Sequence, residues 1–320
     1  ATTENYTLSL HDALPILATK RSVMLMQQTP YMSLSLFDFL EIEGSLNIAY
    51  FHNKGVKQFE GQQAVSASAY LRLSEELPSL RLGYFQPPVG TKFDDHTYLL
   101  KQVTGKVSKM PIIADDYAEF GVQFDYESID WMSLSAGVFG SNNLSKLQGV
   151  MKDDGTYQPL VNSTEPSFAM RAAFYPDFED INTAFGTYYF VNSGGTVNSN
   201  GAFNNYFYIA DVFLHLGIED EFAILTEYIR SYKNNARATN NFLVEFNYIV
   251  TDPLNVYIRA ERAITEEKLT NDIYYNNQLT LGSHISPLPF FDFIIEYKIY
   301  QREALPGYSS QWAAQLHLFY

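Results

Sequence analysis

The chain ends with Ser310-Gln311-Trp312-Ala313-Ala314-Gln315-Leu316-His317-Leu318-Phe319-Tyr320. Counted back from Tyr320, every second residue as far as Trp312 is apolar, and the residues between them are mostly polar or small. This period of two predicts a β-strand with one apolar face and one face that water can reach. The closing strand of a transmembrane β-barrel has this pattern, because its apolar face meets lipid and both of its edges are paired. The alternative for this stretch alone is an edge strand of a soluble β-sandwich.

The composition favours a membrane barrel. The 320 residues include 24 Tyr, 24 Phe and 2 Trp, and a ring with a wet hydroxyl suits a membrane–water boundary. The mean hydropathy of −0.16 is too polar for a helical membrane protein, and no apolar run approaches the roughly 18 residues of a spanning helix. There is no Cys, which a barrel closed by backbone hydrogen bonds does not need. The net charge of −15 argues against a nucleic-acid partner.

The beginning of the chain differs in character from the rest. The string Tyr6-Thr7-Leu8-Ser9-Leu10-His11-Asp12-Ala13-Leu14-Pro15-Ile16 resembles the in-frame translation of a common sequencing adapter. We therefore expect residues 1–16 to be a non-native segment and residues 17–320 to form a single outer-membrane β-barrel domain. The alternative is an ordinary N-terminal segment.

Alternating segments recur from Arg21 to the end of the chain. They predict an all-β, up-and-down transmembrane barrel of about 16 antiparallel strands, with about 14 to 18 also compatible. The expected strands are 21–28, 32–40, 44–51, 64–73, 80–85, 117–126, 131–139, 167–175, 183–190, 205–216, 222–232, 240–249, 256–263, 273–284, 291–301 and 310–320. The connections alternate in length, and the short ones fall on the side where the chain ends. A soluble sandwich would not segregate its loops in this way.

The polar face of the expected strands carries charges of both signs. A charge that faces the middle of a bilayer costs about 2–4 kcal/mol, so these residues must line the lumen. A ring of about sixteen strands is too wide for side chains to fill, so the lumen should hold water. The expected lumen-lining residues are Arg72, Glu119, Asp125, Arg171, Glu245, Arg259, Glu261, Asp292, Glu296 and Lys298.

The stretch from Gln86 to Ala114 is too long for a simple connection. Folded inward, it would narrow the pore, whereas the alternative is a solvated extracellular loop. The expected constriction residues are Arg81, Lys92, Asp94, Asp95, His96, Lys101, Lys106 and Lys109. The sequence Asp94-Asp95-His96 also suggests metal binding, but no second His cluster is spaced to join it, so we expect no metal and no cofactor.

A family resemblance appears at Leu80-Arg81-Leu82-Gly83-Tyr84-Phe85-Gln86-Pro87-Pro88-Val89-Gly90. This stretch resembles the phosphate-selective porin O/P family, and the aromatic terminus resembles the C-terminal insertion signal of bacterial outer-membrane barrels. The family resemblance implies a passive, sixteen-stranded and typically trimeric porin, hence a homotrimer. The chain's acidity departs from an anion-selective family, so phosphate selectivity does not carry over. We expect at most a weak anion preference, set by Lys92, Lys101, Lys106 and Lys109.

The sequence thus predicts a porin of the bacterial outer membrane for passive diffusion of small hydrophilic solutes or ions. Its expected partners are the lipid bilayer, lipopolysaccharide and these solutes, and no catalytic residue is expected. One alternative is a non-transporting barrel that anchors or sheathes a periplasmic or surface partner protein. Another is a membrane-embedded hydrolase, which would need His284 or His96 to converge with a Ser and an acid.

Overall fold

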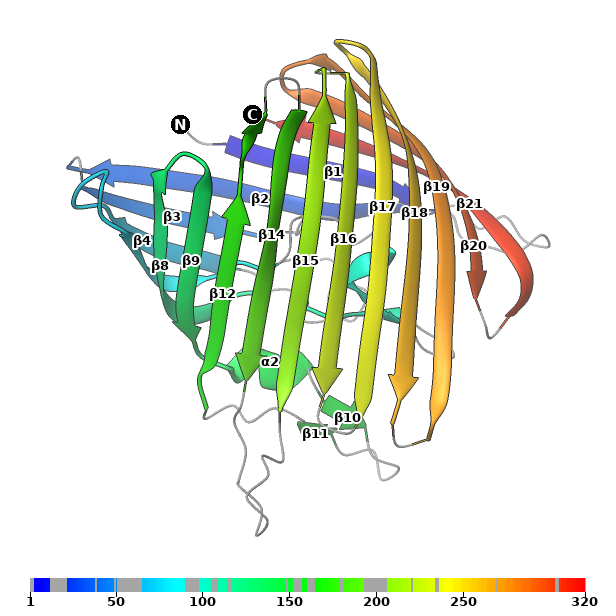
Figure 1. Ribbon diagram of the computed structural model, residues 1–320, viewed down its shortest axis with the longest axis horizontal. Coiled ribbons are helices and arrows are strands. Elements are labelled where there is room, and N and C mark those ends of the chain that lie inside the picture. The colour runs from blue at the N-terminus through cyan, green and yellow to red at the C-terminus, as the bar shows by residue number, and fades with distance from the viewer. Residues whose placement is uncertain are drawn as a thin grey trace.

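The computed structural model describes residues 3–11, 22–37, 39–48, 50, 65–89, 98–104, 109–113, 117–147, 149–151, 157–159, 165–178, 181–192, 206–219, 221–233, 236–268, 270–302 and 305–319. Most of these residues belong to a single antiparallel sheet (Figure 1). Its strands are β1 (Thr3–His11), β2 (Ser22–Leu36), β3 (Leu40–Leu46), β4 (Val65–Leu71), β5 (Ser79–Phe85), β8 (Glu119–Ile129), β9 (Met132–Phe139), β12 (Ser167–Phe174), β13 (Asp177–Phe178), β14 (Ile181–Asn192), β15 (Phe207–Ile218), β16 (Phe222–Lys233), β17 (Arg237–Thr251), β18 (Leu254–Glu267), β19 (Asp272–Leu288), β20 (Phe291–Arg302) and β21 (Leu305–Phe319).

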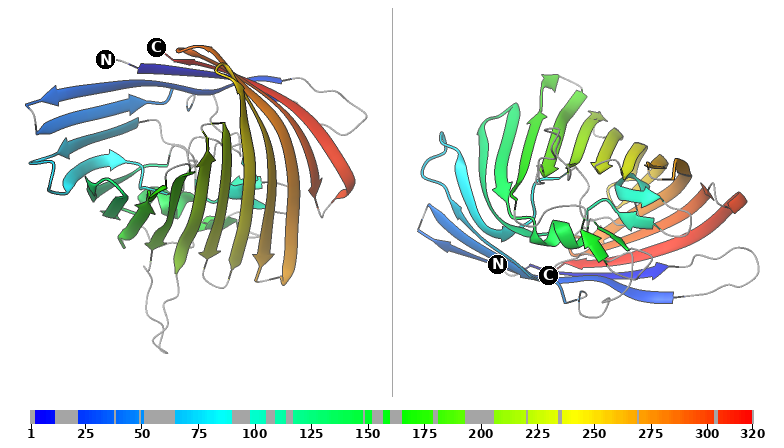
Figure 2. Two further views of the ribbon diagram at one scale, coloured as in Figure 1. Left: turned by 45° about the horizontal axis from the view of Figure 1, so that its top comes forward. Right: turned by 90° about the horizontal axis from the view of Figure 1, so that it is seen from below.

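The sheet closes on itself. Each strand pairs with the next in chain order, and β1 pairs with both β2 and β21. The short β13 pairs only with β14, in continuation of β12, so the ring consists of the other 16 of its 17 strands. Closure leaves no edge of the ring unpaired, which is the condition for a sheet to cross hydrocarbon. The predicted sixteen-stranded barrel is therefore confirmed. Viewed from below, its strands surround the segments that follow β5 and β9 (Figure 2).

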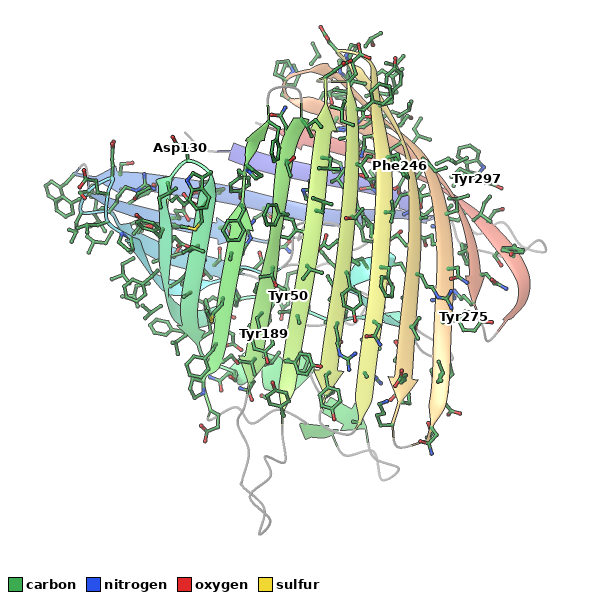
Figure 3. The ribbon with its side chains drawn as sticks, viewed as in Figure 1. Tyr50, Asp130, Tyr189, Phe246, Tyr275 and Tyr297 are labelled. Atoms are coloured by element: carbon green, nitrogen blue, oxygen red, sulfur yellow. The ribbon has the colours of Figure 1, made fainter. Side chains whose placement is uncertain are left out.

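Side chains alternate between an outer and an inner face along each strand. On β17, Phe242 and Phe246 are exposed, whereas Asn241 and Glu245 are buried. On the last strand, Trp312 is 64% exposed and its neighbour Ala313 is buried. Large apolar side chains therefore cover the outer face, as expected for a barrel wall that meets lipid. Figure 3 shows this outer covering, with Tyr189 near one end of the wall and Phe246 nearer the other.

The loop lengths agree with the prediction only in the first part of the chain. The short turn between β8 and β9 lies at the top of Figure 1 with the C-terminus, and strand ends that border long connections, such as the end of β14 and the start of β15, lie at the bottom. The connections expected at 233–239, 265–271 and 302–309 are also short, because β17, β18 and β21 extend into them. The predicted segregation of long and short loops is therefore wrong for this part of the chain.

The first strands also differ from the prediction. Most of the segments 21–28 and 32–40 forms one long strand, β2, which ends at Leu36, and β3 lies at Leu40–Leu46 instead of 44–51. In turn, β1 lies within residues 1–16, which we expected to be non-native. One strand is lost and one is gained, so the expected number is kept although its first members are wrong. The non-native origin of residues 1–16 stays a prediction.

Helices are few and short in the described part of the chain. The 3-10 helix η2 (Leu99–Lys101) follows β5, and the α-helix α2 (Asn142–Leu147) follows β9. Small two-stranded sheets are formed by β6 (Gln102–Thr104) with β7 (Lys109–Pro111) and by β10 (Gly149–Met151) with β11 (Tyr157–Pro159). Among the described residues, no helix has the length and apolar character needed to cross a membrane.

Candidate functional site in the barrel lumen

A cluster of charges surrounds Arg259 on the inner wall. Its guanidinium lies 3.1 Å from Glu245, 3.3 Å from Glu261 and 2.7 Å from Glu296, and the Arg259 side chain is only 1% exposed. Lys298 adds a second cation, 2.8 Å from Glu296. The sheet register places Arg259 opposite Glu245, and the period of two places Glu261 on the same face as Arg259. Local strand geometry therefore assembles this cluster.

The cluster satisfies most of its charges within the wall. The Tyr257 hydroxyl donates to Glu296 at 2.8 Å, and the Gln278 amide donates to Glu261 at 2.9 Å. Buried charges are tolerated when opposite charges and hydrogen bonds replace the lost water. The arrangement is a buried ionic network and does not resemble a nucleophile with its base.

The segment after β5 folds onto this cluster. Backbone amides of Leu99 and Leu100 donate to Oε1 of Glu261 at 2.6 and 3.2 Å. The Asn241 side chain donates to the carbonyl oxygens of Leu100 and Gln102 at 2.6 and 2.8 Å. These contacts place η2 and the start of β6 against the inner face of β17 and β18, inside the ring.

Further contacts hold both ends of this inward segment. The Tyr98 ring lies 3.8 Å from the guanidinium carbon of Arg259, within the range of a cation–π interaction. The Thr104 hydroxyl lies 3.0 Å from the hydroxyl of Thr265 on β18. We call residues Tyr98–Thr104 the inner segment. It lies inside the barrel, as the inward alternative for the stretch from Gln86 to Ala114 requires.

The expected constriction residues are only partly described. The Lys101 side chain is buried on the inner segment, and Lys109 begins β7. Arg81 lies on β5, where it forms an ion pair with Glu43 at 3.3 Å instead of contributing to the Arg259 cluster. Lys92, Asp94, Asp95, His96 and Lys106 lie outside the described residues.

A second inward element packs beside the first. Oε1 of Glu119 accepts hydrogen bonds from the backbone amides of Asn143 and Leu144 at 2.6 and 3.0 Å, which fixes the start of α2. The Tyr117 hydroxyl donates to the same oxygen at 3.2 Å. Burial, and then the Glu119 charge, raise the pKa of Tyr117 well above its usual value, so the hydroxyl remains protonated and can donate.

Part of the lumen is apolar, which the sequence analysis missed. Inward-facing side chains of the wall pack with the inner segment and α2 into one buried cluster. Its members include Phe85, Tyr98, Leu100, Phe139, Leu144, Tyr188, Phe190, Phe207 and Ile209. The signal was present in the sequence, because strands such as 207–213 place apolar residues on both faces. The water path therefore cannot fill the whole cross-section of the ring.

The expected lumen-lining residues separate into groups. Glu245, Arg259, Glu261, Glu296 and Lys298 come together, whereas Glu119 holds α2. The remaining residues lie elsewhere: Arg171 on β12, Asp125 on β8, Asp292 beside His284, and Arg72 just beyond the end of β4. Sequence reasoning missed Glu41 and Glu43, because the expected strand 44–51 left them in a connection.

The described residues assemble no metal site, and His284 does not form a hydrolytic triad with its neighbours. No group of three or more His, Asp or Glu side chains suited to a metal ion occurs in the described part of the chain. His284 does meet an acid and a hydroxyl, since its Nε2 lies 3.2 Å from Asp292 and 3.4 Å from Ser286. Both partners approach the same ring nitrogen, so the imidazole cannot relay a proton from one to the other.

The architecture is shared with solved outer-membrane proteins. The outer membrane channel DcaP of Acinetobacter baumannii matches with a TM-score of 0.66 and 7% identity, over 100% of this chain and 96% of that chain. OprB of Pseudomonas putida matches with a TM-score of 0.66 and 9% identity, over 99% and 93%. A trimer form of OmpT, an outer membrane protein of Vibrio cholerae, matches with a TM-score of 0.62 and 10% identity, over 100% and 98%. No protein-family profile and no curated protein sequence matches the chain.

At these identities the similarity establishes the fold and nothing finer. The resemblance to the phosphate-selective porin O/P family stays a prediction. The closed sixteen-stranded ring, the apolar outer face and the solved neighbours agree with one another. The chain therefore has the fold of a porin-type β-barrel of the bacterial outer membrane.

Proposed function

We propose that this protein is a passive porin for small hydrophilic solutes or ions. The observation that carries the proposal is the inner segment docked on the charged wall at Glu261 and Asn241. A segment held inside the ring narrows the lumen, and partly exposed charges elsewhere on the wall, such as Arg81 and Glu43, present a polar surface to a passing solute. The shared fold with DcaP of Acinetobacter baumannii, an outer membrane channel, supports this function.

Passage through such a lumen needs no catalytic group and no cofactor. Partly exposed side chains of both signs, exemplified by Arg81 and Glu43, order water across the path and hinder large apolar solutes. The lipid bilayer surrounds the apolar outer face, with lipopolysaccharide at the end of the long loops. We propose a homotrimer as the assembly, which the trimer form of OmpT supports.

The test is electrical recording from the purified, folded chain in planar lipid bilayers. Stepwise conductance increases that scale with salt concentration are expected for a water-filled pore. A matched preparation that is heat-unfolded before addition serves as the control. Inserted, folded protein that carries no current would contradict the proposal.

One observation favours a second candidate, a non-transporting barrel that anchors or sheathes a partner protein. The apolar cluster around Phe190 and Phe207 occupies part of the lumen, as it would in a barrel whose lumen is blocked to solutes. The same recording separates the two functions, because a sealed barrel inserts without conducting. Copurification of a stoichiometric partner with the non-conducting protein would then support the second function.

A further inference from the structure

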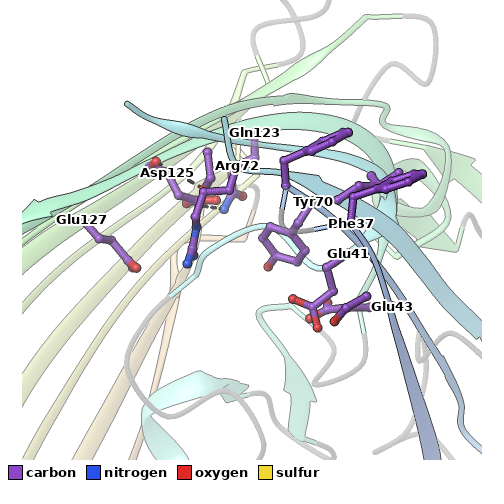
Figure 4. Close-up of a pocket in the computed structure, with 12 residues that line it drawn as sticks. Phe37, Glu41, Glu43, Tyr70, Arg72, Gln123, Asp125 and Glu127 are labelled. Atoms are coloured by element: carbon purple, nitrogen blue, oxygen red, sulfur yellow. Dashed lines mark hydrogen bonds between the residues drawn. The ribbon is translucent and has the colours of Figure 1, made fainter. Parts of the chain in front are cut away.

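A pocket opens on the opposite wall from the Arg259 cluster. It has a volume of about 630 Å³ and lies near the short turns that end β2, β4 and β8. Its lining residues are mostly polar or aromatic side chains, and Figure 4 shows several of them around one space. Those used below are Phe37, Phe39, Glu41, Glu43, Gln123, Asp125 and Glu127.

Negative charge predominates in this pocket. Four carboxylates line it, and Arg72 is the one cation among its lining residues. Arg81 lies beside the pocket and is already engaged with Glu43 at 3.3 Å. Glu41 accepts a hydrogen bond from the Ser33 hydroxyl. Because this donor is neutral, it does not balance the negative charge of Glu41. A positive ligand therefore gains from entering this space.

Gln123 indicates what kind of cation fits. Its side chain is buried, with the residue only 6% exposed, and its amide nitrogen donates to Asp125 at 2.7 Å. Its carbonyl oxygen accepts no hydrogen bond from the protein. Together with the carboxylates, this oxygen offers acceptors and calls for a ligand with several N–H donors. An ammonium or guanidinium group meets that requirement.

The aromatic rim adds an apolar contact. The rings of Phe37 and Phe39 stack with centroids 5.4 Å apart and planes 7° apart, and Phe37 is 75% exposed. Such rings bind the carbon skeleton of an organic cation and attract its charge. A bare alkali-metal ion would use the carboxylates but gain little from this rim.

We propose that this acidic–aromatic pocket is a binding site for small organic cations with an ammonium or guanidinium group. The inference rests on the proposed porin function, because it assigns a solute class to one mouth of the lumen. A site for cations contradicts the weak anion preference that the sequence predicted from four lysines. One of these lysines, Lys101, is buried. The cation would gather at the short-turn mouth before crossing the barrel.

Calorimetric titration of the folded chain in detergent tests the pocket without requiring conduction. The probes are butylguanidinium and its neutral isostere butylurea. The native protein is expected to bind butylguanidinium about tenfold more tightly. The triple variant Glu41→Gln, Asp125→Asn and Glu127→Gln is expected to lose this preference. Equal binding of both probes by the native protein, or a preference that survives in the triple variant, would overturn the proposal.

A matched control variant carries the same number of neutralised acids on other exposed short turns. It combines Glu219→Gln, Glu221→Gln and Asp252→Asn and is expected to keep the native preference. Bilayer recordings distinguish the two proposals. Conduction without selective binding would overturn the pocket and leave the porin standing, whereas selective binding without conduction would do the reverse.

Discussion

The backbone amide of Leu99 donates to Oε1 of Glu261 at 2.6 Å, although the two residues lie 162 positions apart in the chain. The same carboxylate group accepts from Leu100 and Gln278 and forms an ion pair with Arg259. One side chain therefore joins the inner segment to the charged wall. This dual role makes Glu261 the most informative position for mutation.

Replacing Glu261 with Ala should destabilise the barrel by about 2–5 kcal/mol. The substitution leaves buried donors without an acceptor and removes one counter-charge from Arg259. Urea unfolding of the detergent-folded protein measures the change. The control is Glu267→Ala, whose ion pair with Arg237 is about a quarter exposed and should contribute less than about 1 kcal/mol. Equal losses in both variants would contradict the role assigned to Glu261.

The position of the inner segment can be tested by a disulfide. The native chain has no Cys, so Thr104→Cys with Thr265→Cys introduces its only thiols. The two native hydroxyls are 3.0 Å apart, and a small adjustment brings sulfur atoms to the bond length of about 2.05 Å. Mild oxidation should therefore consume both thiols in a maleimide assay. The pair Thr104→Cys with Thr251→Cys should stay reduced, because Thr251 ends β17 at the short-turn side. Free thiols in the first pair would mean that the segment leaves the wall.

The outward face can be tested at Phe124, which lies in the middle of β8 and is 54% exposed. Phe124→Arg should cost about 2–4 kcal/mol of folding free energy in lipid, because the charge would face hydrocarbon. Phe124→Leu keeps an apolar side chain and should cost far less. Refolding into vesicles over a urea series measures both. A well-tolerated arginine would show that this face does not meet the bilayer core.

Close packing within the wall predicts a contrast between two glycines. A Cβ on Gly282 would come within 2.1 Å of the ring of Tyr257, whose hydroxyl donates a hydrogen bond to Glu296, whereas a Cβ on Gly44 would meet nothing closer than 3.7 Å. Gly282→Ala should destabilise the protein by about 1–3 kcal/mol through overpacking. Gly44→Ala should change the stability by less than about 0.5 kcal/mol. Thermal unfolding measures the two variants side by side, and similar melting temperatures would count against this packing.

Sequence reasoning succeeded where the evidence is local. Alternation within 117–126 correctly placed Phe120 and Phe124 on the outer face and Glu119 on the inner face. Alternation within 291–301 likewise placed Glu296 on the inner face and its chain neighbours on the outer face. It failed at β3, where 44–51 was chosen and the carboxylates of Glu41 and Glu43 were lost from the inner face. Residues 40–46 do alternate, with Leu40, Ile42 and Leu46 opposite Glu41, Glu43 and Ser45, so the local signal was present and the predicted strand bounds missed it.

The sequence by itself determined which side chains face lipid and which face inward, because a period of two is a property of neighbouring residues. Only the tertiary structure decided that Leu99 meets Glu261, that α2 is held by Glu119, and that aromatic side chains fill part of the lumen. Those contacts join segments far apart in the chain. Their formation depends on how a connection folds across a closed ring, and no local pattern encodes that.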